Sequence, residues 1–137
     1  MGKEVLTIDV KITAINEVKG KAGTARMILF DGDASSEYFK GTILPGGVDT
    51  QKEKPEEGVL LSARYILDGT DYKGNACRIF IENNGSFKGE IDSITKPMVI
   101  TDSKALEFLE TAPLYGSIEG IEGGVKIHIF TENDNIE

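Results

Sequence analysis

The chain has 137 residues, of which 39% are hydrophobic and 28% charged, and its net charge is −8. This size and composition are typical of one folded domain and exclude a disordered chain. With 23 acidic against 15 basic residues and no basic run interleaved with aromatic residues, we expect no nucleic-acid partner.

Period-two alternation of apolar and polar residues begins close to the N-terminus. In residues 4–13 every second residue is apolar, which predicts a half-buried strand. Residues 25–30 follow a turn rich in glycine and lysine, and they are expected to pair with that strand as a hairpin. The next two strands are predicted over residues 37–44 and 59–67, separated by a Pro-Gly-Gly break, Asp49 and a charged, exposed loop.

The second half of the chain continues the same pattern. Residues 75–83 form the fifth predicted strand, and the sequence Asn83-Asn84-Gly85 after it is a strong turn signal. The pattern over residues 87–100 is weaker and indicates one short strand near 90–94 and another beginning at Met98. The last two strands are predicted over residues 114–119 and 125–130, joined by a glycine-rich turn.

One segment has a helical pattern instead. Asp102 and Ser103 are candidate caps for a short helix over residues 103–110, which Pro113 would end. One helix among about eight strands, with turn signals at roughly ten-residue spacing, predicts an all-β barrel or sandwich. We expect a single domain over residues 1–131 and a frayed acidic tail over residues 132–137.

Three motifs give the chain a resemblance to a known family. They are the segment 41–49 (Gly-Thr-Ile-Leu-Pro-Gly-Gly-Val-Asp), the tripeptide Ala63-Arg64-Tyr65, and Asp71 ahead of the next strand. With these motifs the sequence resembles DUF3237, a family of uncharacterised bacterial and fungal proteins. The resemblance implies a small antiparallel up-and-down β-barrel of the calycin type, similar in architecture to lipocalins. The family has no agreed activity.

Asp49 and Arg64 are the first candidate site residues. If both point into the mouth of the barrel, the planar donors of the arginine could hold a carboxylate or carbonyl group of a ligand. The alternative is a structural ion pair, or an arginine that lies on the outer face. Both faces of its predicted strand are mixed in polarity, so the pattern leaves the direction of Arg64 open.

Three aromatic or titratable residues complete the candidates. Tyr65 could supply a phenol at the pocket wall or be a core tyrosine, and Tyr38 could line the mouth of the barrel. His128 is the single histidine and is either a surface residue or a catalytic base. With one histidine and no acidic residues at metal-ligand spacing, we expect no metal site. The sequence has no phosphate-loop or dinucleotide-binding motif, so we expect no cofactor.

The sequence therefore favours a binding module that takes a small organic molecule in an open apolar cavity of roughly 300 Å³ or more. A cofactor-free isomerase, cyclase or hydratase acting on a carbonyl compound is the alternative, and it requires Asp49 and Arg64 in one cavity. A homodimeric scaffold is a third hypothesis. No apolar run could span a bilayer, no signal peptide is evident, and Cys77 is the single cysteine, so we expect a cytoplasmic protein without membrane contact.

Overall fold

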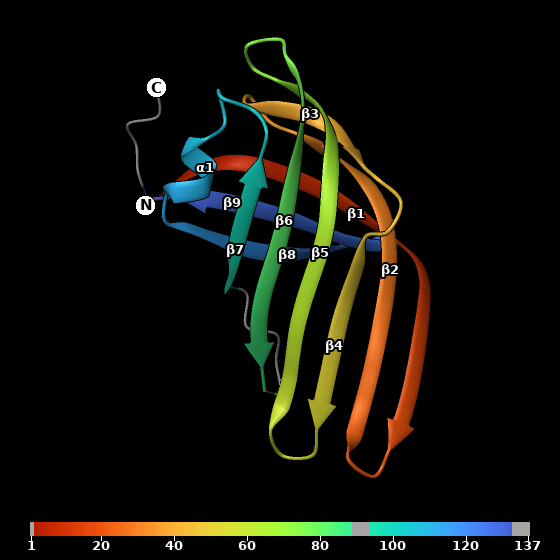
Figure 1. Cartoon of the computed structure of the whole chain (residues 1–137). Helices are drawn as coiled ribbons and strands as arrows, with labels where there is room; N and C mark the ends of the chain where they lie inside the picture. The colour runs from red at the N-terminus through yellow and green to blue at the C-terminus, as the bar shows by residue number, and fades with distance from the viewer. Residues whose placement is uncertain (1, 89–93, 133–137) are drawn as a thin grey trace.

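Nine antiparallel strands make up most of residues 2–88 and 94–132, the part of the chain that the computed structural model describes (Figure 1). A single short helix, α1 (Phe108–Thr111), lies between the seventh and eighth strands. The strands are β1 (Lys3–Gly20), β2 (Gly23–Ser35), β3 (Phe39–Ile43), β4 (Val48–Lys54), β5 (Gly58–Asp71), β6 (Ala76–Phe87), β7 (Ile94–Thr101), β8 (Leu114–Ile121) and β9 (Gly124–Thr131).

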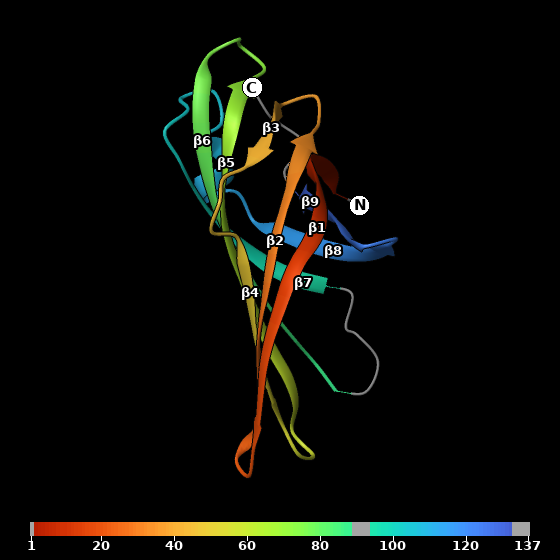
Figure 2. The same ribbon diagram turned by 90° about the vertical axis from the view of Figure 1, so that its right-hand side faces the viewer.

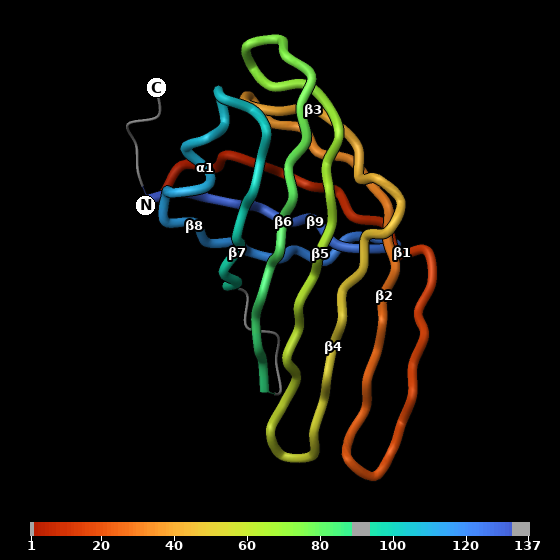
Figure 3. Tube along the Cα trace, viewed as in Figure 1, coloured from red at the N-terminus to blue at the C-terminus, as the bar shows by residue number. Residues whose placement is uncertain are grey.

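The strands close into a ring, because β1 pairs with both β2 and β9. Strands β3 and β4 both lie between β2 and β5, and they run in the same direction. They are two parts of one strand position that is interrupted at residues 44–47, where the trace leaves the sheet (Figure 3). Nine strands thus fill eight positions of an up-and-down barrel, which confirms the predicted fold class.

The charged segment after the Pro-Gly-Gly break is strand β4, so the predicted exposed loop is wrong. Its residues pair with β2 on one side and with β5 on the other. Asp49, Gln51 and Glu53 alternate with Thr50 and Lys52, so both faces of the strand are polar. Without an apolar face the segment shows no period-two hydrophobic signal, although its backbone is fully paired within the sheet.

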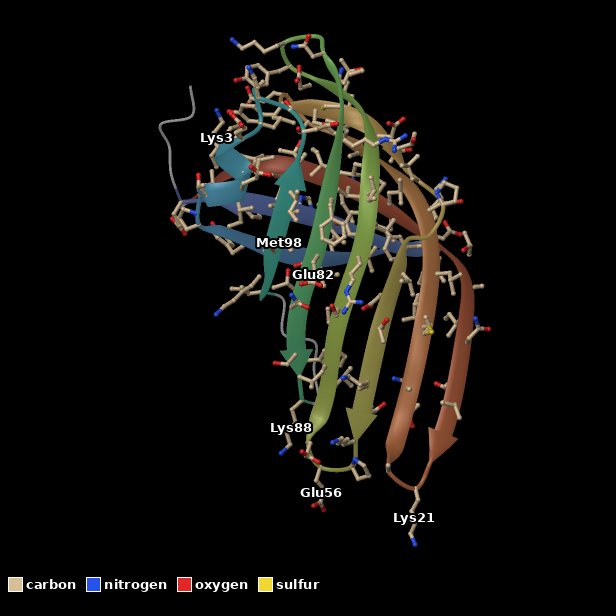
Figure 4. All side chains as sticks on the ribbon, in the orientation of Figure 1. Lys3, Lys21, Glu56, Glu82, Lys88 and Met98 are labelled. Carbon is tan, nitrogen blue, oxygen red and sulfur yellow. The ribbon has the colours of Figure 1, made fainter. Side chains whose placement is uncertain are left out.

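The hairpin β1–β2 is longer than predicted, and the hairpin β4–β5 replaces the predicted exposed loop. Both hairpins project beyond β8 and β9 (Figure 2). Their tips lie at the end of the molecule marked by Lys21, Glu56 and Lys88, opposite Lys3 (Figure 4). Residues 11–20 of β1 are all exposed. Because neither face of this part of β1 is buried, its sequence does not alternate between apolar and polar residues, and the predicted strand therefore ends near residue 13.

Two further boundaries differ from prediction. Asn83-Asn84-Gly85 is not a turn but part of β6: all three residues pair with β5, and Asn83 and Asn84 also pair with β7. The predicted helix over residues 103–110 begins instead as a tight turn, in which the Leu106 amide donates to the Ser103 carbonyl, and α1 follows only at Phe108. The predicted strand near 90–94 and the tail lie almost entirely outside the described residues.

The core fills the barrel between β1, β5, β6 and β9, and the segment around α1 covers the end opposite the hairpin tips (Figure 1). Leu106 and Leu109 of that segment are buried against the core. No helix within residues 2–88 and 94–132 is long and apolar enough to cross a membrane. The fully buried hydrophobic side chains include Leu6, Ile8, Phe39, Leu67, Ile79, Ile81 and Ile129.

Candidate functional site

An apolar pocket lies inside the barrel, on the side of the core that faces the hairpins. Its volume is about 230 Å³, which is below the roughly 300 Å³ expected, yet larger than cavities of about 150 Å³ that bind benzene. Three polar side chains, Asp49, Gln51 and Asn83, reach it. The other lining residues are Val10, Ile12, Ile28, Phe30, Leu61, Ala63, Phe87, Ile118, Val125 and Ile127.

Asp49 reaches the pocket because the chain re-enters the sheet after the Pro-Gly-Gly break. Gly46 has a φ of 114°, a conformation that L side chains rarely adopt, and Gly47 packs its backbone against the ring of Phe30. Strand β4 then begins at Val48, and its second residue, Asp49, points inward beside Ala63 of β5. The break therefore determines where the carboxylate enters the barrel.

The environment of Asp49 opposes ionisation. Burial raises the pKa of its carboxyl group, and the Gln51 side chain and the Ser62 backbone beside it only partly offset this effect. Gln51 Nε2 donates to Asp49 Oδ2 at 2.9 Å, whereas the buried Oδ1 has no hydrogen-bond partner among the described residues. This oxygen is left free to contact a bound molecule.

Asn83 lies in the same row of the barrel wall. Asp49 pairs with Ala63, and Ala63 pairs in turn with Asn83 of β6, so the two polar residues flank the alanine. Only 2% of Asn83 is exposed, and its Oδ1 also has no hydrogen-bond partner among residues 2–88 and 94–132. Buried polar atoms are almost always paired in folded proteins. Of the six buried side-chain oxygens without a hydrogen-bond partner among the described residues, these two belong to residues that line the pocket.

The prediction that Asp49 and Arg64 share one cavity is wrong. Arg64 follows Ala63 on β5 and therefore points to the opposite face of the sheet, where its side chain is 57% exposed. Its Nε donates to Oε2 of Glu82 at 2.9 Å, and Figure 4 shows Glu82 on this outer face. The mixed polarity of β5 leaves the direction of the Arg64 side chain open, and the pairing register of β5 with β4 and β6 decides it.

The two tyrosines lie away from the pocket. Tyr65 points inward one row further from the hairpins, with its ring edge-to-face against Phe30, and burial raises the pKa of its phenol. Its hydroxyl is buried without a partner in the described structure. Tyr38 packs against Tyr72 and Phe108 near α1, at the other end of the barrel. Tyr65 thus has the position of a core tyrosine.

His128 lies on the outer face of β9 and does not reach the pocket. Its Nδ1 is 2.7 Å from Glu4 Oε2, and its Nε2 is 3.0 Å from Glu119 Oε1. The hydrogen bond with Glu119 and that with Glu4 raise the pKa of the imidazole despite partial burial. Within the described ranges no group of three His, Cys, Asp or Glu side chains is placed to hold a metal ion.

Sequence reasoning missed Gln51, Asn83 and Phe87 as pocket residues. Gln51 was assigned to an exposed loop, and its strand has no apolar face that would have revealed it. Asn83 could have been found, because it continues the period-two series of Cys77, Ile79 and Ile81 on the inward face of β6. The turn signal of the Asn-Asn-Gly sequence concealed this continuity.

A larger hollow between the hairpin tips is a weaker candidate. Its volume is about 480 Å³, and charged residues such as Lys19 and Lys54 line it. The guanidinium of Arg26, which also lines this hollow, is already paired with Glu17 at 2.6 Å and with Glu53 at 2.9 Å. Its arginine thus has two carboxylate partners within the protein, unlike the free oxygens of the lumen.

Three proteins illustrate what the chain is similar to. A UPF0311 protein of Clostridium acetobutylicum is 40% identical over 57 residues, and this match spans 42% of the chain and about a third (34%) of the relative. A crystal structure of a β-barrel-like protein from Acinetobacter baumannii has a TM-score of 0.79 at 19% identity, covering 96% of this chain and 94% of the other. An enzyme from Penicillium herquei has a TM-score of 0.75 at 10% identity, covering 96% and 92%.

At these identities the two solved structures show the fold alone. The family comparison extends over nearly the whole chain, since residues 3–131 match a family described as a protein of unknown function. This range includes every strand of the barrel, the break at residues 44–47 and all residues that line the pocket. The chain belongs to the DUF3237 family.

Proposed function

We propose that the protein binds one small, largely apolar molecule in the pocket at the hairpin side of the barrel. The observation that supports this proposal is the free, buried Oδ1 of Asp49 in an otherwise apolar cavity of about 230 Å³. Binding sites of this kind combine an apolar wall with a few polar groups that orient the ligand. Barrels with eight strand positions are wide enough to hold one small ligand.

A thermal-shift screen of small organic compounds tests the proposal, because a ligand that binds the folded state raises the melting temperature by mass action. The screen should be repeated with Ala63→Leu, which fills the pocket between Asp49 and Asn83. Arg64→Ala is the matched control, since it changes the neighbouring residue on the outer face. We expect the shifts to disappear in Ala63→Leu and to persist in Arg64→Ala. Equal shifts in all three proteins would place the binding elsewhere.

The alternative expected from the sequence, a cofactor-free isomerase, cyclase or hydratase with Asp49 and Arg64 in one cavity, fails in that form because Arg64 lies on the outer face. An enzyme of this class would have to use Asp49 alone. A carboxyl group whose pKa is raised by burial is suited to proton transfer near neutral pH. Compounds that bind in the screen can be recovered and compared by mass spectrometry and NMR before and after incubation. Conversion by the wild type but not by Asp49→Asn would support the enzyme, and unchanged compounds support the binding module.

We further propose the cytoplasm as the compartment of this protein. Cys77 is the single cysteine of the chain and lies buried as a free thiol on the inward face of β6. Burial raises the pKa of this thiol, which lowers its reactivity. A fold that uses no disulfide suits a reducing compartment. Fractionation of cells that produce the protein with an epitope tag tests this directly.

A further inference from the structure

We propose that the pocket selects small apolar primary amines, whose ammonium group lies over Ala63 between Asp49 and Asn83. This inference rests on the proposed binding function and specifies the chemistry of the ligand. It follows from three features of the pocket: the arrangement of its polar atoms, the sign of its charge, and the number of acceptors that lack a donor.

The arrangement is set by the register of three adjacent strands. Asp49, Ala63 and Asn83 form one row across β4, β5 and β6, and all three line the cavity. Neighbouring strands lie about 4.8 Å apart, so about 10 Å separates the backbones of Asp49 and Asn83. The short side chain of Ala63 leaves the space between them empty, and one small head group can contact both.

The charge of the lining excludes an anionic ligand. Asp49 is the charged side chain of the pocket, and the described residues that line it include no lysine, arginine or histidine. Arg26 of β2 pairs in register with Gln51 and shares the inward face, but it does not line the cavity. Its guanidinium is held by Glu17 at 2.6 Å and Glu53 at 2.9 Å. Arg64 lies on the outer face, paired with Glu82. A carboxylate ligand would meet an unpaired carboxylate in an apolar cavity, whereas a cation would supply the missing partner.

The number of free acceptors favours an ammonium over a hydroxyl group. Asp49 Oδ1 and Asn83 Oδ1 both lack a donor in the described structure. A hydroxyl group carries one donor and can satisfy one of them, while a primary ammonium carries three. The third donor can remain directed toward the open, hairpin side of the pocket, where water is accessible.

The test uses four probes with one carbon skeleton: 2-phenylethylamine, 2-phenylethanol, phenylacetate and ethylbenzene. Their dissociation constants are measured by isothermal titration calorimetry and by NMR shifts of the inward methyl groups. We expect the amine to bind most tightly and phenylacetate most weakly. Asp49→Asn should weaken binding of the amine about thirtyfold and leave ethylbenzene unaffected, which also shows that the variant folds with an intact pocket. Asn83→Ala should weaken the amine about fivefold.

Asp68→Asn is the matched control, because it removes the same charge from the outer face of β5, where Asp68 pairs with Arg78. It should leave all four affinities unchanged. If the alcohol or ethylbenzene binds the wild type as tightly as the amine, or if Asp49→Asn and Asp68→Asn weaken the amine equally, the inference is wrong while the binding function stands. If none of the four probes binds the wild type, the inference is also wrong, and the binding function is then decided by the thermal-shift screen alone.

Discussion

Gln51 Nε2 donates a hydrogen bond to Asp49 Oδ2 at 2.9 Å, and both side chains project from the same face of β4 into the pocket. The two residues are separated by one position, so the pleat of the strand places them side by side. The amide stabilises the ionised carboxylate, whereas burial favours the neutral acid. The protonation state of the pocket therefore depends on the balance between this one hydrogen bond and the apolar wall.

Replacing Gln51 by leucine should raise the pKa of Asp49 further. The substitution removes the side-chain donor to the carboxylate and adds apolar surface beside it, and both changes favour the neutral acid. A pH titration of the side-chain carboxyl carbon by ¹³C NMR measures the change. Thr50→Ala, which alters the intervening residue on the other face of β4, is the control and should leave the pKa unchanged. A lower pKa in Gln51→Leu would show that the amide does not stabilise the charge.

Asp49→Asn should increase the stability of the protein at pH 7. Because burial raises the folded pKa of Asp49 above its ordinary 3.8, the stabilising, protonated state is fully present below pH 3.8 and is lost as the pH rises through the folded pKa. Asparagine avoids the cost of the buried charge, and we expect a gain of about 0.5–2 kcal/mol in the free energy of unfolding.

Urea unfolding of wild type and Asp49→Asn at several pH values measures this gain. It should be largest at neutral pH and should shrink as the pH falls toward 3.8, where the wild-type carboxyl group also becomes neutral. A gain that is independent of pH would mean that the charge is not its cause. A destabilised variant at pH 7 would show that the ionised carboxylate has a stabilising partner within the protein.

His128 should make the stability depend on pH near neutrality. Glu119 and Glu4 raise its folded pKa above 6.5, so its contribution is fully present below pH 6.5 and is lost as the pH rises through the folded value. Burial raises the pKa of Glu4, but hydrogen bonds from Thr7 and His128 and the charge of Lys126 lower it below 4.5 overall. The contacts of His128 with its two glutamates therefore stabilise the fold fully between about pH 4.5 and pH 6.5.

His128→Gln should consequently lower the free energy of unfolding by at most about 1 kcal/mol at pH 6, since the site is partly exposed to solvent. The difference from the wild type should vanish at higher pH, once the imidazole is neutral. Chemical denaturation at pH 6 and pH 9 gives both values. Equal losses at the two pH values would assign the effect to packing against Phe130, whose ring stacks on His128.

Ser103→Ala should loosen the segment that covers one end of the barrel. Ser103 Oγ donates to Asp71 Oδ2 at 2.7 Å and accepts the Leu106 amide at 3.2 Å, and it is buried. The Ser103 hydroxyl lowers the pKa of Asp71, which also accepts two backbone amides in its own turn. Loss of this hydroxyl should lower the melting temperature by about 3–6 °C.

Hydrogen exchange distinguishes a local from a general effect in this variant. The amides of Leu106 and Leu109 should exchange faster, while those of β5 and β6 away from the turn should be unchanged. Ser117→Ala, on a strand outside this contact, is a suitable control. Unchanged exchange at Leu106 would contradict the role assigned to the Ser103 hydroxyl. The homodimeric scaffold, the third hypothesis from the sequence, stays a prediction, and light scattering on the purified protein tests it directly.

The strands with one apolar face could be predicted from the sequence. Leu6, Ile8, Val10 and Ile12 alternate with polar residues, and β1 begins where this pattern begins. The same logic located β5, β6, β8 and β9, because burial of one face of a strand imposes a period of two on the residues.

The pocket could not be predicted in the same way. Strand β4 has no apolar face, so neither Asp49 nor Gln51 had a hydrophobic pattern around it. The Asn-Asn-Gly sequence, which is typical of turns, concealed the period-two series that Asn83 continues. The direction of Arg64 was undecidable because Leu60 and Ile66 are apolar but lie on the outer face, at 58% and 39% exposure. Only the pairing of β4 with β5 shows which face of β5 points into the barrel and which points outward.

The sequence alone determined that the chain forms an all-β barrel or sandwich and that a strand ends at Pro45-Gly46-Gly47, because alternation and backbone freedom are local properties of the residues. Its resemblance to the DUF3237 family implied the up-and-down barrel. The tertiary structure decided that Asp49 enters the lumen opposite Asn83 and that Arg64 does not. A shift of one residue in register moves every side chain of a strand to the other face. The register depends on contacts with strands distant in sequence, so the identity of the pocket residues is a property of the closed barrel.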